Sequence, residues 1–230
     1  MLATAFADCT NLVGVAVENT TITSATLIPA GGGLPEYCRG QGHVDTEIGF
    51  EIRLPTGWNG KFYFQGSGGF AGNTPAPGPG LVSGYAVATT DTGHQGATPG
   101  PANDASWALN NPDRQINFAY RAVHFVTVAA KQIVQAFYGR LPERSYFEGC
   151  STGGRQALME AQRYPADFNG IIAGAPALDQ TGAVVAENWN AQALHVAPLP
   201  MDKVSGRTIS TTGTKIIGRS PVRLIGRKPK

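Results

Sequence analysis

The spacing of apolar residues changes along the chain, and each change predicts a different element. Residues 48–54 alternate between apolar and other side chains, which predicts a half-buried β-strand. After a turn at residues 55–60, residues 61–64 begin a second strand. The apolar run at residues 85–89 has the composition of a buried strand in a parallel sheet. This part of the chain is therefore expected to contribute strands rather than helices.

From Ile116 the spacing becomes helical. Apolar residues recur at steps of three and four, at Phe118, Ala122, Phe125, Ala129, Ile133 and Phe137. This period predicts a long amphipathic helix, and Gly139 supplies the residue type that commonly ends one.

Strand and helix then alternate. Residues 145–148 are typical of a short strand, and a helical pattern runs from Ala157 to Pro165, which stops it. Residues 170–174 form another short strand, after which the pattern weakens. This alternation predicts an α/β fold with parallel central strands.

A glycine-rich turn separates the strand from the helix. Residues 149–154 read Gly-Cys-Ser-Thr-Gly-Gly and match the G-x-S-x-G nucleophile elbow, which lifts a serine hydroxyl above an α/β sheet. Ser151 is therefore the candidate nucleophile, in a backbone conformation that few residues adopt. The alternative is an ordinary glycine–serine turn, because a chain with 30 glycines contains such a pattern by chance.

Several blocks together resemble the tannase/feruloyl esterase family. They are residues 145–177, Trp-Asn-Gly at 58–60, the segment 84–94 and Tyr-Arg-Ala-Val-His at 120–124. The resemblance covers residues 9–192. It implies an α/β-hydrolase fold with a central, mostly parallel sheet, and an activity on esters of aromatic acids such as gallate, ferulate or the terephthalate half-ester. It also implies an acyl-enzyme on Ser151, a small aromatic ester as the partner, and no cofactor.

An oxyanion hole is expected beside Ser151. One donor is the backbone N–H of Thr152, and the other comes from Gly68 or Gly69 in the glycine-rich loop at residues 66–72. The alternative is a solvent-facing glycine loop. A nucleotide-binding loop is excluded, because this segment has neither the G-x-G-x-x-G spacing nor the lysine of a phosphate loop.

The catalytic base is harder to place. His195 is the only histidine after Ser151, and a triad of Ser151, Asp179 and His195 follows the usual chain order. Too little chain separates these residues, and the resemblance implies an acid and a histidine beyond a lid domain that would follow this sequence. We therefore expect a truncated hydrolase without its lid and last strands, weakly active or inactive. A compact esterase that uses His195 and a non-catalytic binding remnant are the alternatives.

Three histidines precede the serine. His94 follows a strand, where it either lines the pocket or makes a structural hydrogen bond. His124 is expected to pack within the long helix. No spacing of His43 or the others with carboxylates suggests a metal site, so no metal is expected.

The three cysteines leave one unpaired. By resemblance, Cys9 and Cys38 form a disulfide of an exported protein. Cys150 matches a family cysteine that is bonded to another beside the catalytic histidine, and this sequence has no such second cysteine. Cys150 is therefore expected to be free.

Charge is distributed unevenly. All 16 acidic residues lie at or before Asp202, whereas eight of the 18 basic residues lie in 203–230. We expect residues 1–202 to be the amino-terminal part of a catalytic domain and residues 203–230 to be a non-homologous, disordered tail. The tail carries no nucleic-acid recognition motif, and no apolar run has the length of a membrane span.

The first residues bear on localisation. The resemblance implies a secreted or periplasmic protein, and Ala5-Phe6-Ala7 looks like the cleavage site of an incomplete signal peptide. A frayed apolar start is the alternative.

Overall fold

The computed structural model describes residues 8–96, 104–196, 210–211 and 214–215. Contacts divide the chain into two units, Met1–Leu178 and Asp179–Lys230. The boundary predicted after residue 202 lies inside the second unit. The expected signal-peptide remnant at residues 1–7 lies outside the described residues.

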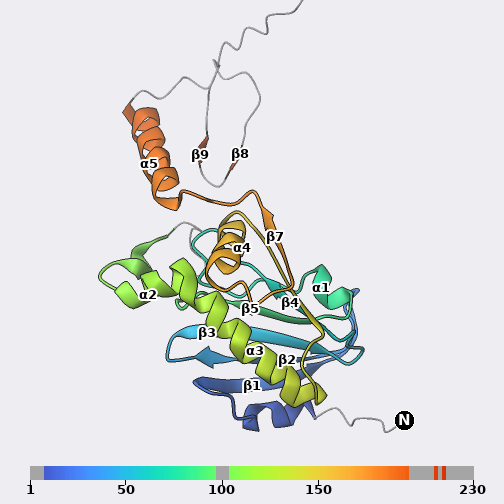
Figure 1. Ribbon diagram of the computed structural model, residues 1–230. Helices are drawn as coiled ribbons and strands as arrows, with labels where there is room; N and C mark the ends of the chain where they lie inside the picture. Colours follow the sequence, from blue (N-terminus) through green and yellow to red (C-terminus); the bar gives the residue numbers. More distant parts are fainter. Residues whose placement is uncertain (1–7, 97–103, 197–209, 212–213, 216–230) are drawn as a thin grey trace, which may run out of the picture. The chain divides into compact units, whose positions relative to one another are not determined.

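A seven-stranded mixed sheet forms the centre of the first unit (Figure 1), in the order β1-β2-β3-β5-β4-β6-β7. The antiparallel side consists of β1 (Thr20–Ile28), β2 (Tyr37–Val44) and β3 (Ile48–Pro55), and β3 pairs antiparallel with β5 (Ala86–Thr90). The parallel side consists of β5, β4 (Lys61–Gln65), β6 (Arg144–Cys150) and β7 (Gly170–Gly174). All five predicted strands are present within two residues of the expected bounds.

The prediction of a half-buried strand at residues 48–54 was wrong, because both faces of β3 are buried. Glu51 and Arg53 lie on the face expected to be solvated, and Glu51 Oε1 accepts a 2.6 Å bond from Arg53 Nε. The Arg53 guanidinium also donates to the Pro75 carbonyl at 2.5 Å. The loop that carries Pro75 therefore covers this face, and the two charges are retained because they neutralise each other.

The predicted long helix is confirmed, with an interruption. Its segments are α2 (Pro112–Ile116), a π-helical turn η3 (Asn117–Arg121) and α3 (Ala122–Tyr138). Gly139 ends α3 with φ 74°, a left-handed conformation that favours glycine. α3 packs against β3 and β5, whereas α4 (Thr152–Arg163) packs against β6 and β7.

The remaining elements of the first unit are short. They are η1 (Cys9–Gly14), α1 (Pro79–Val82) and η2 (Ser106–Ala108). η1 is joined to β2 by a disulfide between Cys9 and Cys38, as predicted. A cross-link between residues 29 positions apart stabilises by about 3–4 kcal/mol in the chain-entropy model. Cys150 is a free, exposed thiol.

The second unit contains α5 (Gln180–Val196) and a small hairpin of β8 (Ser210–Thr211) and β9 (Thr214–Lys215). The rest of the predicted basic tail lies outside the described residues, so its disorder stays a prediction. Among the helices that the structure describes, none combines the length and the apolar character that a bilayer crossing requires.

Candidate functional site

Ser151 occupies the sharp turn between β6 and α4. Its backbone has φ 60° and ψ −116°, a conformation that non-glycine residues rarely adopt, and the residue is exposed. The turn is held from β7 and the loop after it. The Ser151 N–H donates to the Gly174 carbonyl (3.0 Å), and the Ser151 carbonyl accepts from the N–H of Ala177 (3.1 Å). The strain is therefore maintained by hydrogen bonds on both sides of the residue.

Three glycines make this turn possible, because backbones pass where side chains would lie. A Cβ on Gly149 would be 2.4 Å from the carbonyl carbon of Gly153. A Cβ on Gly154 would be 2.4 Å from the Gly174 carbonyl oxygen, and one on Gly153 would be 2.9 Å from the Ser67 carbonyl oxygen. The elbow thus requires glycine at each of these positions.

The glycine-rich loop at residues 66–72 is fastened to the start of α4. Thr152 Oγ1 donates to the Gly69 carbonyl (2.6 Å), and the Ser67 N–H donates to Gln156 Oε1 (3.0 Å). The Ser67 hydroxyl donates to the Thr90 carbonyl (3.1 Å), at the end of β5. Ser67 therefore anchors the loop to the sheet, whereas Gly68 and Gly69 are exposed, which the alternative of a solvent-facing loop also expects.

Hydrogen bonds within the described residues leave only some of the loop's N–H groups available. Those already committed belong to Gly66, Ser67, Ala71 and Gly72. The N–H groups of Gly68, Gly69 and Thr152 donate to no described residue. A Cβ on Gly68 would contact nothing within 4 Å, so this position borders open space. The three expected oxyanion donors thus have N–H groups free to bind a ligand.

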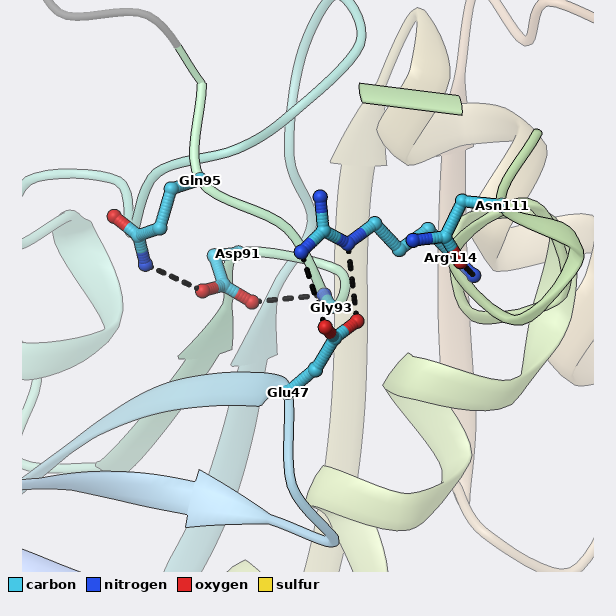
Figure 2. A network of polar contacts seen from close by, with 6 residues as sticks. All are labelled: Glu47, Asp91, Gly93, Gln95, Asn111 and Arg114. Atoms are coloured by element: carbon cyan, nitrogen blue, oxygen red, sulfur yellow. Dashed lines mark hydrogen bonds and ion pairs between the residues drawn. The ribbon is translucent and has the colours of Figure 1, made fainter. Parts of the chain in front are cut away.

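Asp91 fixes the neighbouring loop, as Figure 2 shows. Its Oδ1 accepts from the N–H of Gly93 (2.8 Å), and its Oδ2 accepts from the Gln95 amide (2.9 Å). The Gly49 N–H, which the figure does not draw, also donates to Oδ1 (2.9 Å). Burial raises the pKa of Asp91 to about 6, although these N–H donors favour the charged form. The Asp91 carbonyl in turn accepts from the Gly72 N–H (3.0 Å), which joins this loop to the glycine-rich loop.

An ion pair between Arg114 and Glu47 lies beside Asp91 (Figure 2). The Arg114 guanidinium donates two 3.0 Å hydrogen bonds to the Glu47 carboxylate. The backbone N–H of Arg114 donates to Asn111 Oδ1 at 3.2 Å, which caps the start of α2. The guanidinium lowers the pKa of Glu47. This bidentate pair joins the start of α2 to the turn between β2 and β3.

His94 is buried in an aromatic cluster. Its ring stacks on Trp107 with centroids 3.7 Å apart, and Phe70 and Phe118 contact Trp107 from other sides. Burial lowers the pKa of His94. These contacts favour the structural interpretation of His94, although the residue also lines a cleft with Asp91 and Arg114.

Arg155 connects the elbow helix to this cluster. Its guanidinium donates to the carbonyls of Phe118 (2.9 Å) and Ala119 (2.7 Å) in η3 and lies 4.6 Å from the Phe118 ring centroid. A π-helical turn leaves carbonyls without their usual helical partners, and here a buried arginine supplies the donors.

Sequence reasoning missed a cluster at the opposite end of α4. His124 was expected only to pack within its helix, but its Nδ1 lies 2.6 Å from Asp167 Oδ2. Glu160, on α4, is 1% exposed, and burial together with the Asp167 carboxylate raises its pKa. Because His124 and Asp167 lie 43 residues apart, no local spacing could reveal the contact.

The catalytic base stays unassigned. In the part of the chain that the structure describes, no side chain hydrogen-bonds to the Ser151 hydroxyl. Asp179 belongs to the second unit, where its Oδ1 accepts from the Gly182 N–H, and the His195 side chain lies outside the described residues. The compact triad of Ser151, Asp179 and His195 is therefore untested.

Comparison with known proteins finds a matching family and similar esterases. The family model for tannase and feruloyl esterase matches residues 35–203. An uncharacterized esterase of Xanthomonas campestris is 41% identical over 191 residues, which cover 76% of this chain and 32% of that protein. A mono(2-hydroxyethyl) terephthalate hydrolase of Piscinibacter sakaiensis is 32% identical over 200 residues, 78% of this chain and 33% of that one. The chain thus spans about a third of the length of these curated relatives.

A solved structure confirms the predicted fold. Feruloyl esterase B from Aspergillus oryzae superposes with a TM-score of 0.68 at 29% sequence identity, over 81% of this chain and 39% of that protein. The fold is that of an α/β-hydrolase, with the parallel strands β5, β4, β6 and β7 on one side of the mixed sheet. The family resemblance seen in the sequence is confirmed as well.

Proposed function

Because the chain belongs to the tannase and feruloyl esterase family, we propose that its first unit is the nucleophile-bearing part of a carboxylic ester hydrolase. The observation that carries the proposal is the conformation of Ser151, which is exposed and has φ 60°. It lies in a turn where backbone segments pass close to three glycines. An ordinary glycine–serine turn would not need glycine at 149, 153 and 154 together.

The mechanism follows from the groups around Ser151. Its Oγ attacks the ester carbonyl while a general base removes the hydroxyl proton. The oxyanion that forms accepts hydrogen bonds from the N–H groups of Thr152 and of Gly68 or Gly69. Collapse of this intermediate expels the alcohol with a proton from the base and leaves an acyl group on Ser151. Water then attacks the acyl group, and the acid is released.

We propose that the general base and the carboxylate that orients it come from the portion of the related proteins that this chain does not match. Residues 1–202 would then be the amino-terminal part of the catalytic domain, a division that agrees with a family match ending at residue 203. The free, exposed thiol of Cys150 adjoins the nucleophile, and we propose that it pairs with a cysteine from that part.

We propose aromatic-acid esters as the substrates. Support comes from similar proteins, one named as a feruloyl esterase and another as a mono(2-hydroxyethyl) terephthalate hydrolase. An exported protein is the matching localisation, because the Cys9–Cys38 disulfide is stable in an oxidising compartment.

Two proteins test the proposal. One is the 230-residue chain, and the other is a chimera in which its residues 1–178 replace the matching segment of the Piscinibacter hydrolase. We expect a fluorophosphonate probe to label the chimera on Ser151, and the chimera to hydrolyse methyl ferulate or the terephthalate half-ester. Ser151→Ala should abolish labelling and lower turnover by several orders of magnitude. Ser83→Ala, at an exposed serine after α1, is the matched control and should change neither.

The possible outcomes distinguish between candidate nucleophiles and between candidate bases. Retained labelling in Ser151→Ala would place the nucleophile elsewhere and overturn the proposal. The 230-residue chain alone should show little turnover. Robust turnover that His195→Ala removes would instead establish a compact enzyme with its base in α5.

A further inference from the structure

Three potential metal ligands meet at the carboxyl end of α4, away from the elbow. His124 comes from α3, Glu160 from α4 and Asp167 from the loop before β7. One donor atom from each lies within 4.8 Å of the other two. We propose that His124, Glu160 and Asp167 bind a divalent transition-metal ion, with Zn²⁺ the best match. An imidazole nitrogen and two carboxylates are a ligand set that Zn²⁺ uses, with water in the fourth position.

The burial of Glu160 is the independent observation that points to a cation. Glu160 is 1% exposed and its carboxyl group is hydrogen-bonded to Asp167, but its Oε2 has no partner among the described residues. A buried carboxylate is costly unless a cation or several donors compensate it. A metal ion placed between the three side chains would supply that compensation directly.

The ligands are held close to the required arrangement. The His124 ring stacks on Tyr164 with centroids 3.8 Å apart, and the Asp167 N–H donates to the Tyr164 carbonyl at 2.9 Å. Tetrahedral bonds of about 2.0–2.2 Å put ligand atoms about 3.3 Å apart. The His124–Asp167 contact of 2.6 Å must therefore open slightly to admit the ion.

A cleft lies beside one of the three proposed ligands. It has a volume of about 220 Å³, and His124 lines it together with Glu18 and Asp45. At about 30 Å³ for each water molecule, this is room for a hydrated ion. The two acidic residues at its edge attract cations electrostatically.

Lys131 is the competing cation. Its ammonium group donates to the Asp167 carbonyl, and burial lowers the pKa of Lys131, although the nearby carboxyl groups of Asp167 and Glu160 act in the opposite direction. Repulsion from this ammonium group weakens metal binding. Lys131→Gln should therefore tighten binding several-fold, which a purely structural ion-pair network would not predict.

The test measures binding and does not depend on esterase activity. The full chain is prepared in a Cys150→Ser background, so that the exposed thiol does not bind metal. We expect one Zn²⁺ per chain by calorimetry and competition with a chromogenic chelator, and visible absorption of tetrahedral type with Co²⁺. Glu160→Gln and His124→Phe should each weaken binding at least about tenfold.

Glu160→Gln is the key variant, because it keeps the shape of the side chain and removes only its charge. Thermal unfolding of this variant without metal checks that the fold is retained. His43→Gln, at a half-buried histidine of β2, is the matched control and should bind as the parent does. Absence of stoichiometric binding by the parent, or equal binding by Glu160→Gln, would overturn the proposal. Those results would assign to Glu160 and Asp167 a shared proton instead.

Discussion

The two ends of α4 are built on different principles. At its amino end, glycines 149, 153 and 154 let three backbones pass within side-chain distance, and hydrogen bonds fix Ser151 and the glycine-rich loop. At its carboxyl end, titratable side chains crowd together, and Glu160 has an oxygen without a donor among the described residues. One end is specified by the absence of side chains and the other by their chemistry.

This difference decides how each end responds to change. Two backbone segments in close contact cannot adjust to an added side chain, because main-chain atoms cannot rotate away as a side chain can. A cluster of flexible side chains can adjust to a proton, an ion or an isosteric replacement. Substitutions at the elbow should therefore cost more than those around His124.

The largest effect is expected for Gly149→Ala. Its Cβ would lie 2.4–2.6 Å from three backbone atoms of Gly153, so either β6 or α4 must move. We expect a loss of about 4 kcal/mol or more in the free energy of unfolding, measured by urea denaturation. Gly57→Ala is the matched control, because a Cβ there contacts nothing within 4 Å. A change in stability as small as the control's would show that the elbow is not tightly packed.

This contrast also explains what the sequence could predict. Gly149, Ser151 and Gly153 lie within five consecutive residues, so their spacing carries the backbone geometry directly. The strands at 145–148 and 170–174 were found for the same reason, because an apolar run or a local period marks them. The elbow and the glycine run were enough to predict the candidate oxyanion donors. Only the structure revealed the hydrogen bonds that leave their N–H groups available.

Other features depended on contacts between distant segments. β1 and β2 were not predicted, because threonine, serine and glycine interrupt any apolar alternation in them. The burial of Glu51 and Arg53 follows from a loop that covers β3 from more than twenty residues away. The cluster of His124, Glu160 and Asp167 combines three segments, and none of them carries a metal-binding or catalytic spacing by itself.

A buried acid sharpens the comparison through pH. Asp91 lies on the elbow side with its oxygens hydrogen-bonded, and its pKa is raised from 3.8 to about 6. A pKa raised by folding means that Asp91 favours the folded state below pH 4 and that this contribution is lost as pH rises through 6. The shift of about two units corresponds to about 3 kcal/mol.

Asp91→Asn isolates that contribution, because asparagine keeps the shape and does not titrate. Between pH 4 and pH 7, the parent should lose about 3 kcal/mol of unfolding free energy relative to the variant. Urea denaturation at several pH values measures it. Parallel profiles would mean that the N–H donors of Gly49 and Gly93 fully compensate the burial of the charge.

At the other end of α4, His124→Phe tests how much the histidine–carboxylate pair contributes. Phenylalanine preserves the ring stack on Tyr164 and leaves Asp167 Oδ2 without its partner. In the presence of a chelator we expect a loss of about 2 kcal/mol, less than for Gly149→Ala, because Asp167 is partly solvated. Thermal unfolding with Val128→Ala as a control on the same helix checks this. A loss equal to that of the elbow glycine would remove the proposed difference between the two ends.

The smallest effect is expected for Thr152→Val, which removes the hydrogen bond from Thr152 Oγ1 to the Gly69 carbonyl but keeps the volume of the side chain. Loss of one hydrogen bond to the carbonyl of exposed Gly69 costs about 1 kcal/mol, so the fold should persist. Function should respond more strongly than stability, because this bond fixes the distance between the N–H groups of Thr152 and Gly69. In the chimera, kcat for the ester should fall at least tenfold while KM changes little, since the oxyanion forms only during the reaction. Equal falls in kcat for Thr152→Val and for Thr152→Ser, which keeps the hydroxyl, would show that the bond does not position the oxyanion hole.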